Sequence, residues 1–316
     1  MKAAVVYKGG GLNVLKIEER PIPAIKAGWS RIKVLGFGIN HSEIFTRQGL
    51  SPSVVFPRVL GIECVGVIDE TSDLQKFRKG QRVVSLMGEM GRAFDGSYEE
   101  YVLVPNDQIY TFKSHLSLKH LVCLPETGFT AFGSLKNMQI CAEDTVLIRG
   151  ATSGVGVMAA RFIKAQYPQI KLVGSTRSYL KGESLKRVGF NEIVYDENGK
   201  LKTHQLYDKV LELIGPATLK DTFQHVREGG IVCSTGQLGG VWNLDFDPII
   251  ELPKNGYLTS FYSGNVSQER VDEFFHYIDK YNIKIEPEKI FTIDDIAEAH
   301  QYIESRKSFG KVIVLL

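Results

Sequence analysis

The order of hydrophobic and polar residues changes twice along the chain. The first third holds short strand-like runs separated by Gly and Pro, which is typical of a mainly β domain. These runs are Ala3–Tyr7, Ser30–Phe37, Val65–Asp69, Arg82–Leu86 and Tyr98–Val104. From about Leu121 a buried strand followed by an amphipathic helix recurs. That rhythm predicts βαβ units and a parallel sheet.

The middle of the chain is therefore predicted to alternate between strands and helices. The predicted strands are Thr145–Arg149, Lys171–Thr176, Glu192–Asp196, Asp208–Ile214 and Gly230–Thr235. Two helices are predicted between them, at Gly156–Ala165 and Leu180–Val188. We expect a further helix to begin near Pro216, because proline suits the first turn of a helix.

The pattern changes again beyond Gly264. Apolar residues recur at helical spacing over Val266–Tyr281, and Ser267 is a suitable N-cap for this helix. A second helix is predicted over Ile293–Ser305, followed by a strand over Lys311–Leu316. We interpret this segment as a return to the first domain. The expected domains are residues 1–120 plus 266–316, and a nucleotide-binding domain of residues 121–265.

Composition and charge exclude several classes of function. Hydrophobic residues make up 43% and charged residues 23% of the chain, as in an ordinary globular protein. The net charge is only +2, and no basic stripe is present to bind nucleic acid. No segment approaches the roughly 18 apolar residues of a membrane-spanning helix, and the N-terminal apolar run is too short for a signal peptide. We expect a cytoplasmic protein that binds neither nucleic acid nor membrane.

The four cysteines lie far apart in the chain and include no Cys-x-x-Cys pair. This spacing argues against a disulfide framework and against a cysteine-rich zinc site. We expect each cysteine to be a buried, small apolar residue.

The strongest local motif is a glycine-containing turn after the strand that ends at Arg149. An apolar strand leads through small residues into a helix, so that backbone amides and the helix dipole can face a pyrophosphate. Two registers are open, Gly154-x-Gly156-x-x-Ala159 and Ala151-x-Ser153-x-x-Gly156. Both predict a dinucleotide-binding turn.

The type of dinucleotide is indicated by the segment Gly174–Lys181. NAD enzymes place a carboxylate here on the ribose 2′-hydroxyl, but this chain has none before Glu183. Arg177 and Lys181, with neighbouring hydroxyls, can hold a 2′-phosphate instead. The segment therefore predicts NADPH, and the alternative is that the two cations belong only to a solvated helix start.

Several short motifs occur in a specific order over nearly the whole chain. They are Gly38–Glu43, Leu60–Ile68, Lys79–Val83, Asp95–Val102, Gly128–Ala131, Gly154–Gly156, Gly236–Gly240 and Gly310–Ile313. In these motifs the chain resembles the medium-chain dehydrogenase/reductase superfamily, and within it the zinc-free NADPH:quinone oxidoreductases. The resemblance implies an α/β protein with a GroES-like, mainly β catalytic domain and a Rossmann domain with a doubly wound parallel sheet.

The resemblance also indicates whether the chain has the residues that bind zinc in this family. The family's alcohol dehydrogenases hold catalytic zinc with a cysteine and a histidine at positions that match Asn40 and Ile62, and an isoleucine cannot bind a metal. The four-cysteine lobe for structural zinc is missing as well, since Gly88–Asp95 is a short loop without cysteine. We therefore expect no zinc.

Without zinc, oxidation of a simple alcohol loses the Lewis acid that stabilises an alkoxide. The resemblance implies instead that NADPH transfers a hydride to an electrophilic small molecule, either a quinone or an α,β-unsaturated carbonyl compound. Phe45 stands where quinone reductases often carry a tyrosine, which weakens the preference for a quinone.

The resemblance makes Asn40 and Tyr262 the candidate catalytic residues. Asn40 matches a residue near the nicotinamide, although it also suits a turn. Tyr262 is a candidate proton donor, although an aromatic residue there can simply pack. Arg47 is either a cation that steers an anion or a solvated surface residue. The expected cofactor contacts are Thr130, Thr152, Ser153, Gly154, Val155, Gly156, Thr176, Arg177, Ser178, Lys181, Gly236, Leu238, Phe261 and Ser263.

Two other functions are consistent with these residues. One is an NADPH-binding redox sensor or structural protein without turnover, and the other is an enoyl-thioester reductase. Relatives commonly pair through an edge of the nucleotide-domain sheet, and the apolar segment Asn255–Phe261 suits such an edge. We therefore expect a homodimer.

Overall fold

The computed structural model describes all 316 residues and divides into two compact units. The first unit contains residues 1–129, 263–280 and 284–316, and the second contains residues 130–262 with 281–283. We expected the first domain to end at residue 120. The division instead falls inside helix α3 (Pro125–Met138), so that no linker separates the two units at this point.

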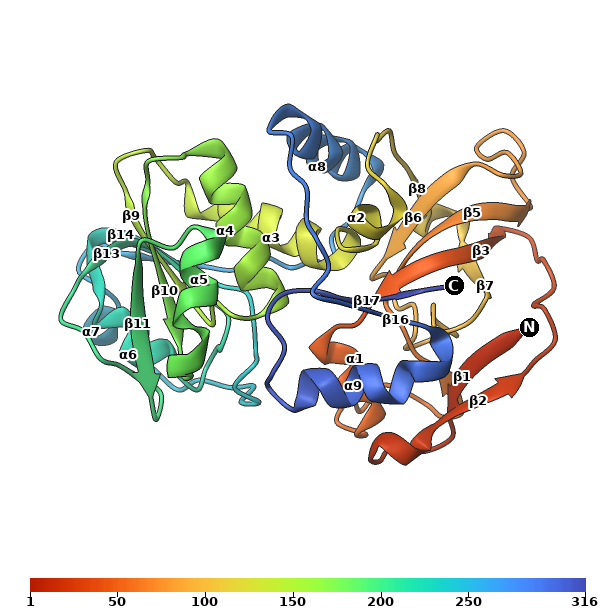
Figure 1. The fold of residues 1–316 in the computed structure, drawn as a ribbon, viewed down its shortest axis with the longest axis horizontal. Helices are drawn as coiled ribbons and strands as arrows, with labels where there is room; N and C mark the ends of the chain where they lie inside the picture. Colours follow the sequence, from red (N-terminus) through yellow and green to blue (C-terminus); the bar gives the residue numbers. More distant parts are fainter. The chain divides into compact units, whose positions relative to one another are not determined.

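The first unit consists mainly of antiparallel strands (Figure 1). Its larger sheet has the order β16-β17-β3-β5-β6-β8, with β7 paired to β3, and its smaller sheet has the order β2-β1-β4. The strands are β1 (Lys2–Val6), β2 (Leu15–Glu19), β3 (Trp29–Gly38), β4 (Arg58–Val59), β5 (Glu63–Thr71), β6 (Arg82–Leu86), β7 (Tyr101–Pro105), β8 (Tyr110–Thr111), β16 (Lys289–Phe291) and β17 (Val312–Leu315). Only β16 and β17 pair in parallel.

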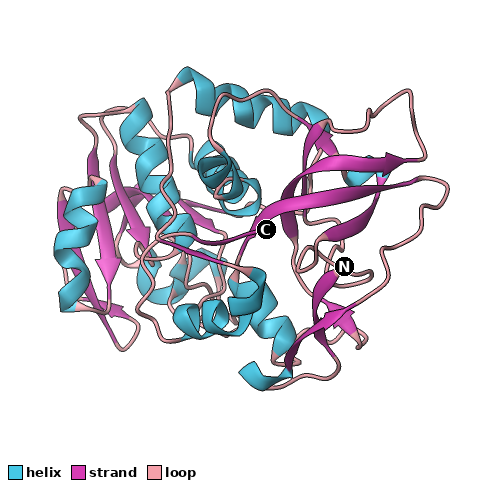
Figure 2. Cartoon of the chain, turned by 45° about the vertical axis from the view of Figure 1, so that its right-hand side comes forward, coloured by secondary structure: helices cyan, strands magenta, loops and turns pink.

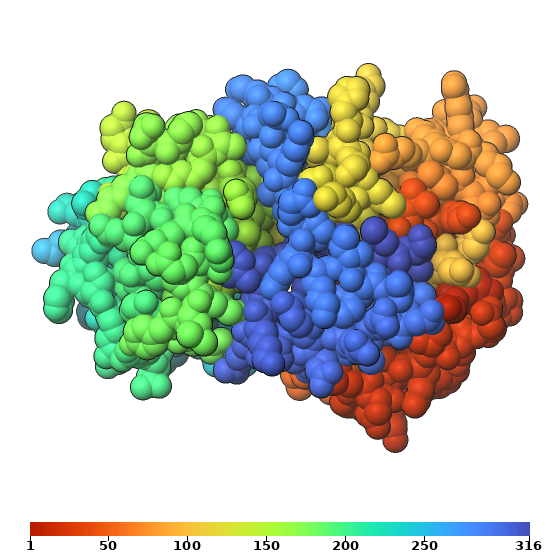
Figure 3. Space-filling model, in the orientation of Figure 1, coloured from red at the N-terminus to blue at the C-terminus, as the bar shows by residue number.

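The first unit also contains helices α1 (His41–Arg47), α2 (Leu118–Val122), α8 (Gln268–Lys280) and α9 (Ile296–Glu304), with 3-10 turns at Leu12–Val14, Asn106–Gln108 and Ile293–Asp295. The N-cap prediction for α8 is confirmed, because the Ser267 hydroxyl accepts a hydrogen bond from the Arg270 amide at 3.3 Å. The C-terminal segment lies beside the N-terminal segment, as Figure 3 shows in blue and red. Lys2 and Asp294 join these two segments by an ion pair of 2.8 Å.

The second unit is built around a seven-stranded sheet with the order β12-β11-β10-β9-β13-β14-β15. The strands are β9 (Thr145–Arg149), β10 (Lys171–Thr176), β11 (Glu192–Glu197), β12 (Lys200–Leu201), β13 (Tyr207–Glu212), β14 (Val226–Ser234) and β15 (Tyr257–Thr259). All neighbours pair in parallel except β11 and β12. The order of the six parallel strands is that of a dinucleotide-binding, doubly wound fold. The predicted fold class is therefore confirmed.

Helices flank this parallel sheet (Figure 2). They are α4 (Gly154–Gln166), α5 (Gly182–Val188), α6 (Leu219–Phe223) and α7 (Pro248–Glu251), with a 3-10 turn at Tyr179–Lys181. The predicted helix start near Pro216 is wrong, because α6 begins at Leu219. The preceding Gly215 has φ +87° and not the extended backbone of an N-cap, so the chain makes a turn before the helix.

Cys64, Cys123 and Cys233 are buried as expected, but the prediction for Cys141 is wrong. Cys141 is exposed in the loop before β9, where its amide donates to the Asp144 carboxylate at 2.7 Å. Loops run over the surface, so a single cysteine in a loop does not have to pack in the core. None of the helices has the length and apolarity that crossing a membrane requires.

Candidate functional site

The phosphate loop follows β9 in the second unit. Gly150 turns the chain with φ +84°, a conformation that favours glycine. A Cβ on Gly156 would lie 2.7 Å from the Gly150 carbonyl oxygen and 2.8 Å from that of Ala151, so only glycine lets the helix approach the strand. This close helix–strand packing is the role of the last glycine in the fingerprint. The structure therefore selects the register Ala151-x-Ser153-x-x-Gly156.

Ser153 caps helix α4, because its hydroxyl accepts a hydrogen bond from the Gly156 amide at 3.1 Å. The amides of Gly154 and Val155 lie in the first turn of α4, where no preceding carbonyl can accept them. Thr152, Ser153, Gly154 and Val155 are all partly exposed. These residues fit a pyrophosphate, since donor groups and the positive end of the helix dipole point to the same place.

The residues expected to recognise the 2′-phosphate follow β10. Thr176 is buried, and its hydroxyl accepts a hydrogen bond from the Ser178 amide at 3.0 Å, which shapes the turn. Arg177 is exposed and forms no ion pair or hydrogen bond within the chain, while Ser178 and Lys181 are partly exposed. The Arg177 guanidinium is therefore accessible to an anionic ligand.

The expected contacts Gly236 and Leu238 lie in the loop after β14. This loop is hydrogen-bonded to the loop after β13, because the Leu238 amide donates to Leu213 at 3.1 Å and the Gly239 amide donates to Ile214 at 2.9 Å. The two loops thus form one layer at the carboxyl edge of the parallel sheet, which is where dinucleotides bind in such folds.

Thr130 and Phe261 also belong to the second unit. Thr130 is buried in α3, and the Phe261 ring packs over Gly133 of the same helix, because a Cβ there would lie 2.1 Å from the ring. Tyr262 is 71% exposed, which leaves its phenol open to solvent. Ser263 falls in the first unit.

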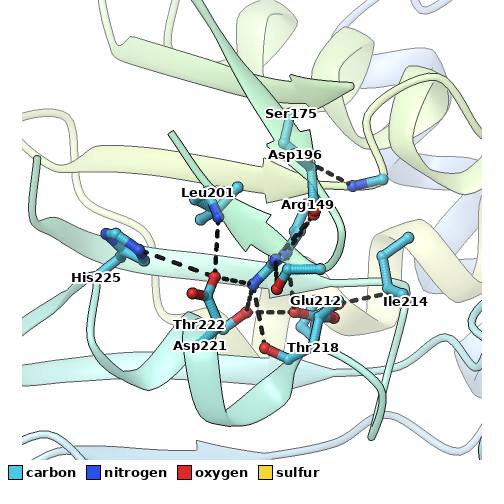
Figure 4. Close-up of polar contacts among 12 residues, drawn as sticks. Arg149, Ser175, Asp196, Leu201, Glu212, Ile214, Thr218, Asp221, Thr222 and His225 are labelled. Atoms are coloured by element: carbon cyan, nitrogen blue, oxygen red, sulfur yellow. Dashed lines mark hydrogen bonds and ion pairs between the residues drawn. The ribbon is translucent and has the colours of Figure 1, made fainter. Parts of the chain in front are cut away.

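A buried arginine precedes the phosphate loop (Figure 4). Arg149 has no exposed surface, and its guanidinium donates to Asp196 at 2.8 Å, to the Thr218 carbonyl at 3.1 Å and to the Thr222 hydroxyl at 2.8 Å. It also donates to the Gly199 carbonyl at 2.9 Å and pairs with Asp221 at 2.9 Å. These hydrogen bonds and ion pairs connect β9 to the β11–β12 turn and to α6.

Glu212, at the end of β13, is the third carboxylate of this network. Its Oε2 atom lies 3.9 Å from the Arg149 guanidinium and accepts a hydrogen bond from the Thr222 hydroxyl. Burial raises the pKa of Glu212, and the charge of Arg149 opposes that rise. These residues do not belong to any motif that the sequence shows. A charged residue ending the apolar run Val146–Ile148 was the available signal, since a buried arginine requires partners.

In the first unit, Asn40 lies in a second buried network. The Lys311 ammonium donates three hydrogen bonds, to Asn40 Oδ1 at 2.7 Å, to Glu63 Oε1 at 2.6 Å and to the Thr127 hydroxyl at 2.7 Å. The Asn40 amide nitrogen donates to Glu63 at 2.9 Å and to Glu43 at 3.3 Å. Asn40 Oδ1 also accepts from Thr127 at 3.2 Å. The hydrogen-bonding capacity of the Asn40 carboxamide is therefore fully used within this unit.

Burial by itself shifts the pKa values of two charged groups of this network in opposite directions. Burial by itself lowers the pKa of Lys311, but the nearby carboxylates of Glu63 and Glu126 outweigh it, so the pKa is raised. Burial raises the pKa of Glu43 to about 7, although the charge of Lys311 opposes the rise. Lys311 therefore stays charged, and Glu43 titrates near neutral pH.

The residues in this network do not fit a zinc site. Ile62 offers no donor, and the oxygens of Asn40 and Glu63 already bind the Lys311 ammonium, whose charge would repel a metal cation. No group of three or more His, Cys, Asp or Glu side chains in the structure has an arrangement that could hold a metal ion.

Both interpretations of Arg47 are wrong. Its side chain is 1% exposed and forms two hydrogen bonds with the Glu304 carboxylate, at 2.6 and 2.9 Å. Arg47 is thus neither a surface residue nor a free steering cation, because it is buried and paired with Glu304. Its partner lies 257 residues later in the chain, so no local pattern indicated this pair. Phe45 is partly exposed on the same helix, α1.

Comparisons with known proteins agree with this fold. The model of the alcohol dehydrogenase GroES-like domain matches residues 26–114, and that of the zinc-binding dehydrogenases matches residues 188–314. The chain is 25% identical to the quinone oxidoreductase of Pongo abelii, over 100% of this chain and 98% of that protein. It is 29% identical to YhfP of Bacillus subtilis over 66% of each chain.

A solved structure similar to this one is the yhdH oxidoreductase of Salmonella enterica in complex with NADP. The TM-score is 0.87 at 19% identity, with all of both chains covered. At this identity the likeness concerns the fold. Together, the two matching family models and the relative that matches end to end show that the chain belongs to the medium-chain dehydrogenase/reductase superfamily, in its quinone oxidoreductase-like branch.

Proposed function

We propose that the chain is an NAD(P)-dependent oxidoreductase that takes a hydride from NADPH and transfers it to a small electrophilic acceptor without zinc. The observation that carries this proposal is the phosphate loop. Its Gly156 packs too closely for any other residue, and the free amides of Gly154 and Val155 stand at the start of α4. That geometry suits a pyrophosphate.

The preference for NADPH over NADH rests on Arg177. This exposed cation without a partner follows β10, where NAD enzymes require a carboxylate. A guanidinium can bind a 2′-phosphate through two parallel hydrogen bonds. The Salmonella oxidoreductase was solved with NADP, which supports the choice.

Independence from zinc rests on the oxygen atoms of Asn40 and Glu63, the groups that could otherwise bind a metal ion. Both already accept hydrogen bonds from the Lys311 ammonium. When bound, NADPH supplies the hydride. The Asn40 carboxamide has no hydrogen-bonding capacity left, so we assign it to the shape of the site and not to proton transfer. The proton then comes from solvent or from the exposed Tyr262 phenol. Catalysis rests on holding the acceptor against the nicotinamide.

The acceptor is a quinone or an α,β-unsaturated carbonyl compound. The name of the Pongo abelii relative supports a quinone, whereas Phe45 removes a phenol that quinone reductases often carry. We also propose a homodimer formed through β15, the edge strand of the parallel sheet, where Tyr257 is 61% and Leu258 37% exposed. A cytoplasmic location stays a prediction.

NADPH oxidation measured against a panel of quinones, enals and enoyl-thioesters tests the reaction. We expect turnover with quinones or enals. Turnover with enoyl-thioesters alone would favour the enoyl-thioester reductase, and tight NADPH binding without any turnover would favour a sensor or structural protein. Addition of a chelator should leave the rate unchanged, and a loss of activity that zinc restores would contradict zinc independence.

Arg177→Ala tests the choice of cofactor. We expect the Kd for NADPH to rise about tenfold, equivalent to about 1.4 kcal/mol, because one charge-assisted contact to the 2′-phosphate is lost. The Kd for NADH should not change. Arg161→Ala is the matched control, since Arg161 is an exposed arginine farther along α4. Equal effects on both cofactors would contradict a role in 2′-phosphate recognition.

A further inference from the structure

The Arg149 network contains a directed chain of hydrogen bonds. The Arg149 guanidinium has only donors, so the Thr222 hydroxyl must accept at their 2.8 Å contact. The hydroxyl proton of Thr222 is then free to point elsewhere, and Glu212 Oε2 accepts it. Arg149 therefore orients the Glu212 carboxylate through Thr222 (Figure 4).

The other oxygen of Glu212 holds the backbone after β13. Glu212 Oε1 accepts hydrogen bonds from the Ile214 amide at 2.7 Å and from the Gly215 amide at 3.1 Å. The backbone of Gly215 is packed tightly as well, because a Cβ there would lie 2.6 Å from the Gly236 carbonyl oxygen. The position of this turn thus depends on the orientation of one buried carboxylate.

The turn after β13 in turn holds the loop after β14. Leu213 and Ile214 accept hydrogen bonds from the amides of Leu238 and Gly239, at 3.1 and 2.9 Å. A continuous path of hydrogen bonds therefore runs from Arg149, next to the phosphate loop, to Gly239.

We propose that Arg149, Thr222 and Glu212 are positioning residues for the dinucleotide, and that they act by fixing the loop Gly236–Gly240. The inference rests on the proposed function, since the loop matters to a ligand only if a dinucleotide binds at this edge. All three side chains are fully buried, so they reach the loop through hydrogen bonds within the protein and not through solvent. Stability alone does not require such a network, because a whole buried ion-pair network replaced by apolar residues of similar size can give comparable stability. Its directed hydrogen bonds instead fix the orientation of a backbone segment.

Thr222→Val tests the proposal, because it removes the hydroxyl with little change in shape. We expect the amides of Ile214, Gly215, Leu238 and Gly239 to exchange with solvent about tenfold faster or more, because the Glu212 carboxylate loses the hydrogen bond that the Thr222 hydroxyl donates. The Kd for NADPH should rise by about tenfold or less for the same reason. Amides of the central strands, such as Leu147 and Val173, should keep wild-type rates.

Two matched variants complete the test. Thr222→Ser keeps the hydroxyl and should restore both exchange rates and affinity. Thr145→Val removes a buried threonine hydroxyl at the start of β9, away from the loops, and should leave both unchanged.

Two outcomes would overturn the proposal. One is unchanged exchange at the four loop amides in folded Thr222→Val, and the other is an equal increase in the central strands, which would show general destabilisation. Exchange is measured on the ligand-free protein, so this result stands apart from the proposed function. If the wild-type protein binds no NADPH, the proposed function fails whatever the exchange rates show.

Discussion

Lys311 in the first unit and Arg149 in the second are both buried cations, but they bind different kinds of partner. The three acceptors of Lys311 are all side chains, so its network orients side chains, Asn40 above all. Arg149 binds carbonyls of the backbone at Thr218 and Gly199 as well as carboxylates, so its network fixes turns.

The difference follows from the shapes of the two groups. An ammonium is a compact charge that donates to acceptors close to one atom. A guanidinium is planar, and its N–H donors point in different directions toward acceptors farther apart. Lysine therefore suits a cluster around one side chain. Arginine suits a junction at which a strand, a turn and a helix meet. The following variants test this contrast.

Arg149→Met should have the largest effect. It leaves the carboxylates of Asp196, Glu212 and Asp221 without their cation, and we expect the free energy of unfolding to fall by about 5 kcal/mol, as for a broken buried ion pair. Urea denaturation followed by circular dichroism measures the change. Lys186→Ala, which breaks an exposed pair with Glu183 at 3.0 Å, is the control and should cost less than about 1 kcal/mol. Equal losses in the two variants would mean that the buried network adds no stability.

Lys311→Met should cost somewhat less, about 4 kcal/mol, because Glu63 keeps hydrogen bonds from Asn40 and from the Glu126 amide. The pKa of Glu43 should rise further, since the charge of Lys311 holds it down. Urea denaturation at several pH values measures both effects. Lys311→Arg keeps the charge and should preserve the pKa of Glu43. A pKa that moves as far in Lys311→Arg as in Lys311→Met would contradict the electrostatic explanation.

Glu43→Gln should have a smaller, pH-dependent effect. Because the pKa of Glu43 is raised from its ordinary value of 4.5 to about 7, the folded protein binds this proton more tightly than the unfolded chain. The stability of the wild type should therefore fall by about 3 kcal/mol as pH rises from 4.5 to 7, owing to this group. In Glu43→Gln this part of the pH dependence should disappear.

The measurement for Glu43 is the difference in unfolding free energy between wild type and variant across this pH range. Glu183→Gln is the control, because it makes the same substitution at an exposed carboxylate outside the Asn40 network. A difference between wild type and Glu43→Gln that is constant with pH would show that Glu43 does not titrate near neutral pH.

Much of the fold was predictable from local patterns. β9 and β10 have the predicted bounds, because a buried parallel strand is a continuous apolar run that ends where the chain turns. The glycine turn was recognisable too, although its register was not. Helices α1 and α3 were not predicted, since each mixes apolar and polar residues without a clear helical period.

The candidate site was predictable only where its residues are neighbours in the sequence. The phosphate loop and the Arg177 segment are of this kind. Arg47 and Lys311 were not, because their partners Glu304 and Glu63 lie 257 and 248 residues away. No local pattern shows whether a charged side chain meets such a partner or faces solvent.

The sequence by itself determined the class of fold, the bounds of β9 and β10, and the loop that suits a dinucleotide phosphate, because these depend on the spacing of residues along a short segment. Tertiary structure alone decided that Arg149 and Lys311 are buried, that Asn40 has no hydrogen bond left to offer, and that Gly156 sets the register of the loop. The physical reason is that a charge in a protein interior depends on partners that only the folded chain brings together.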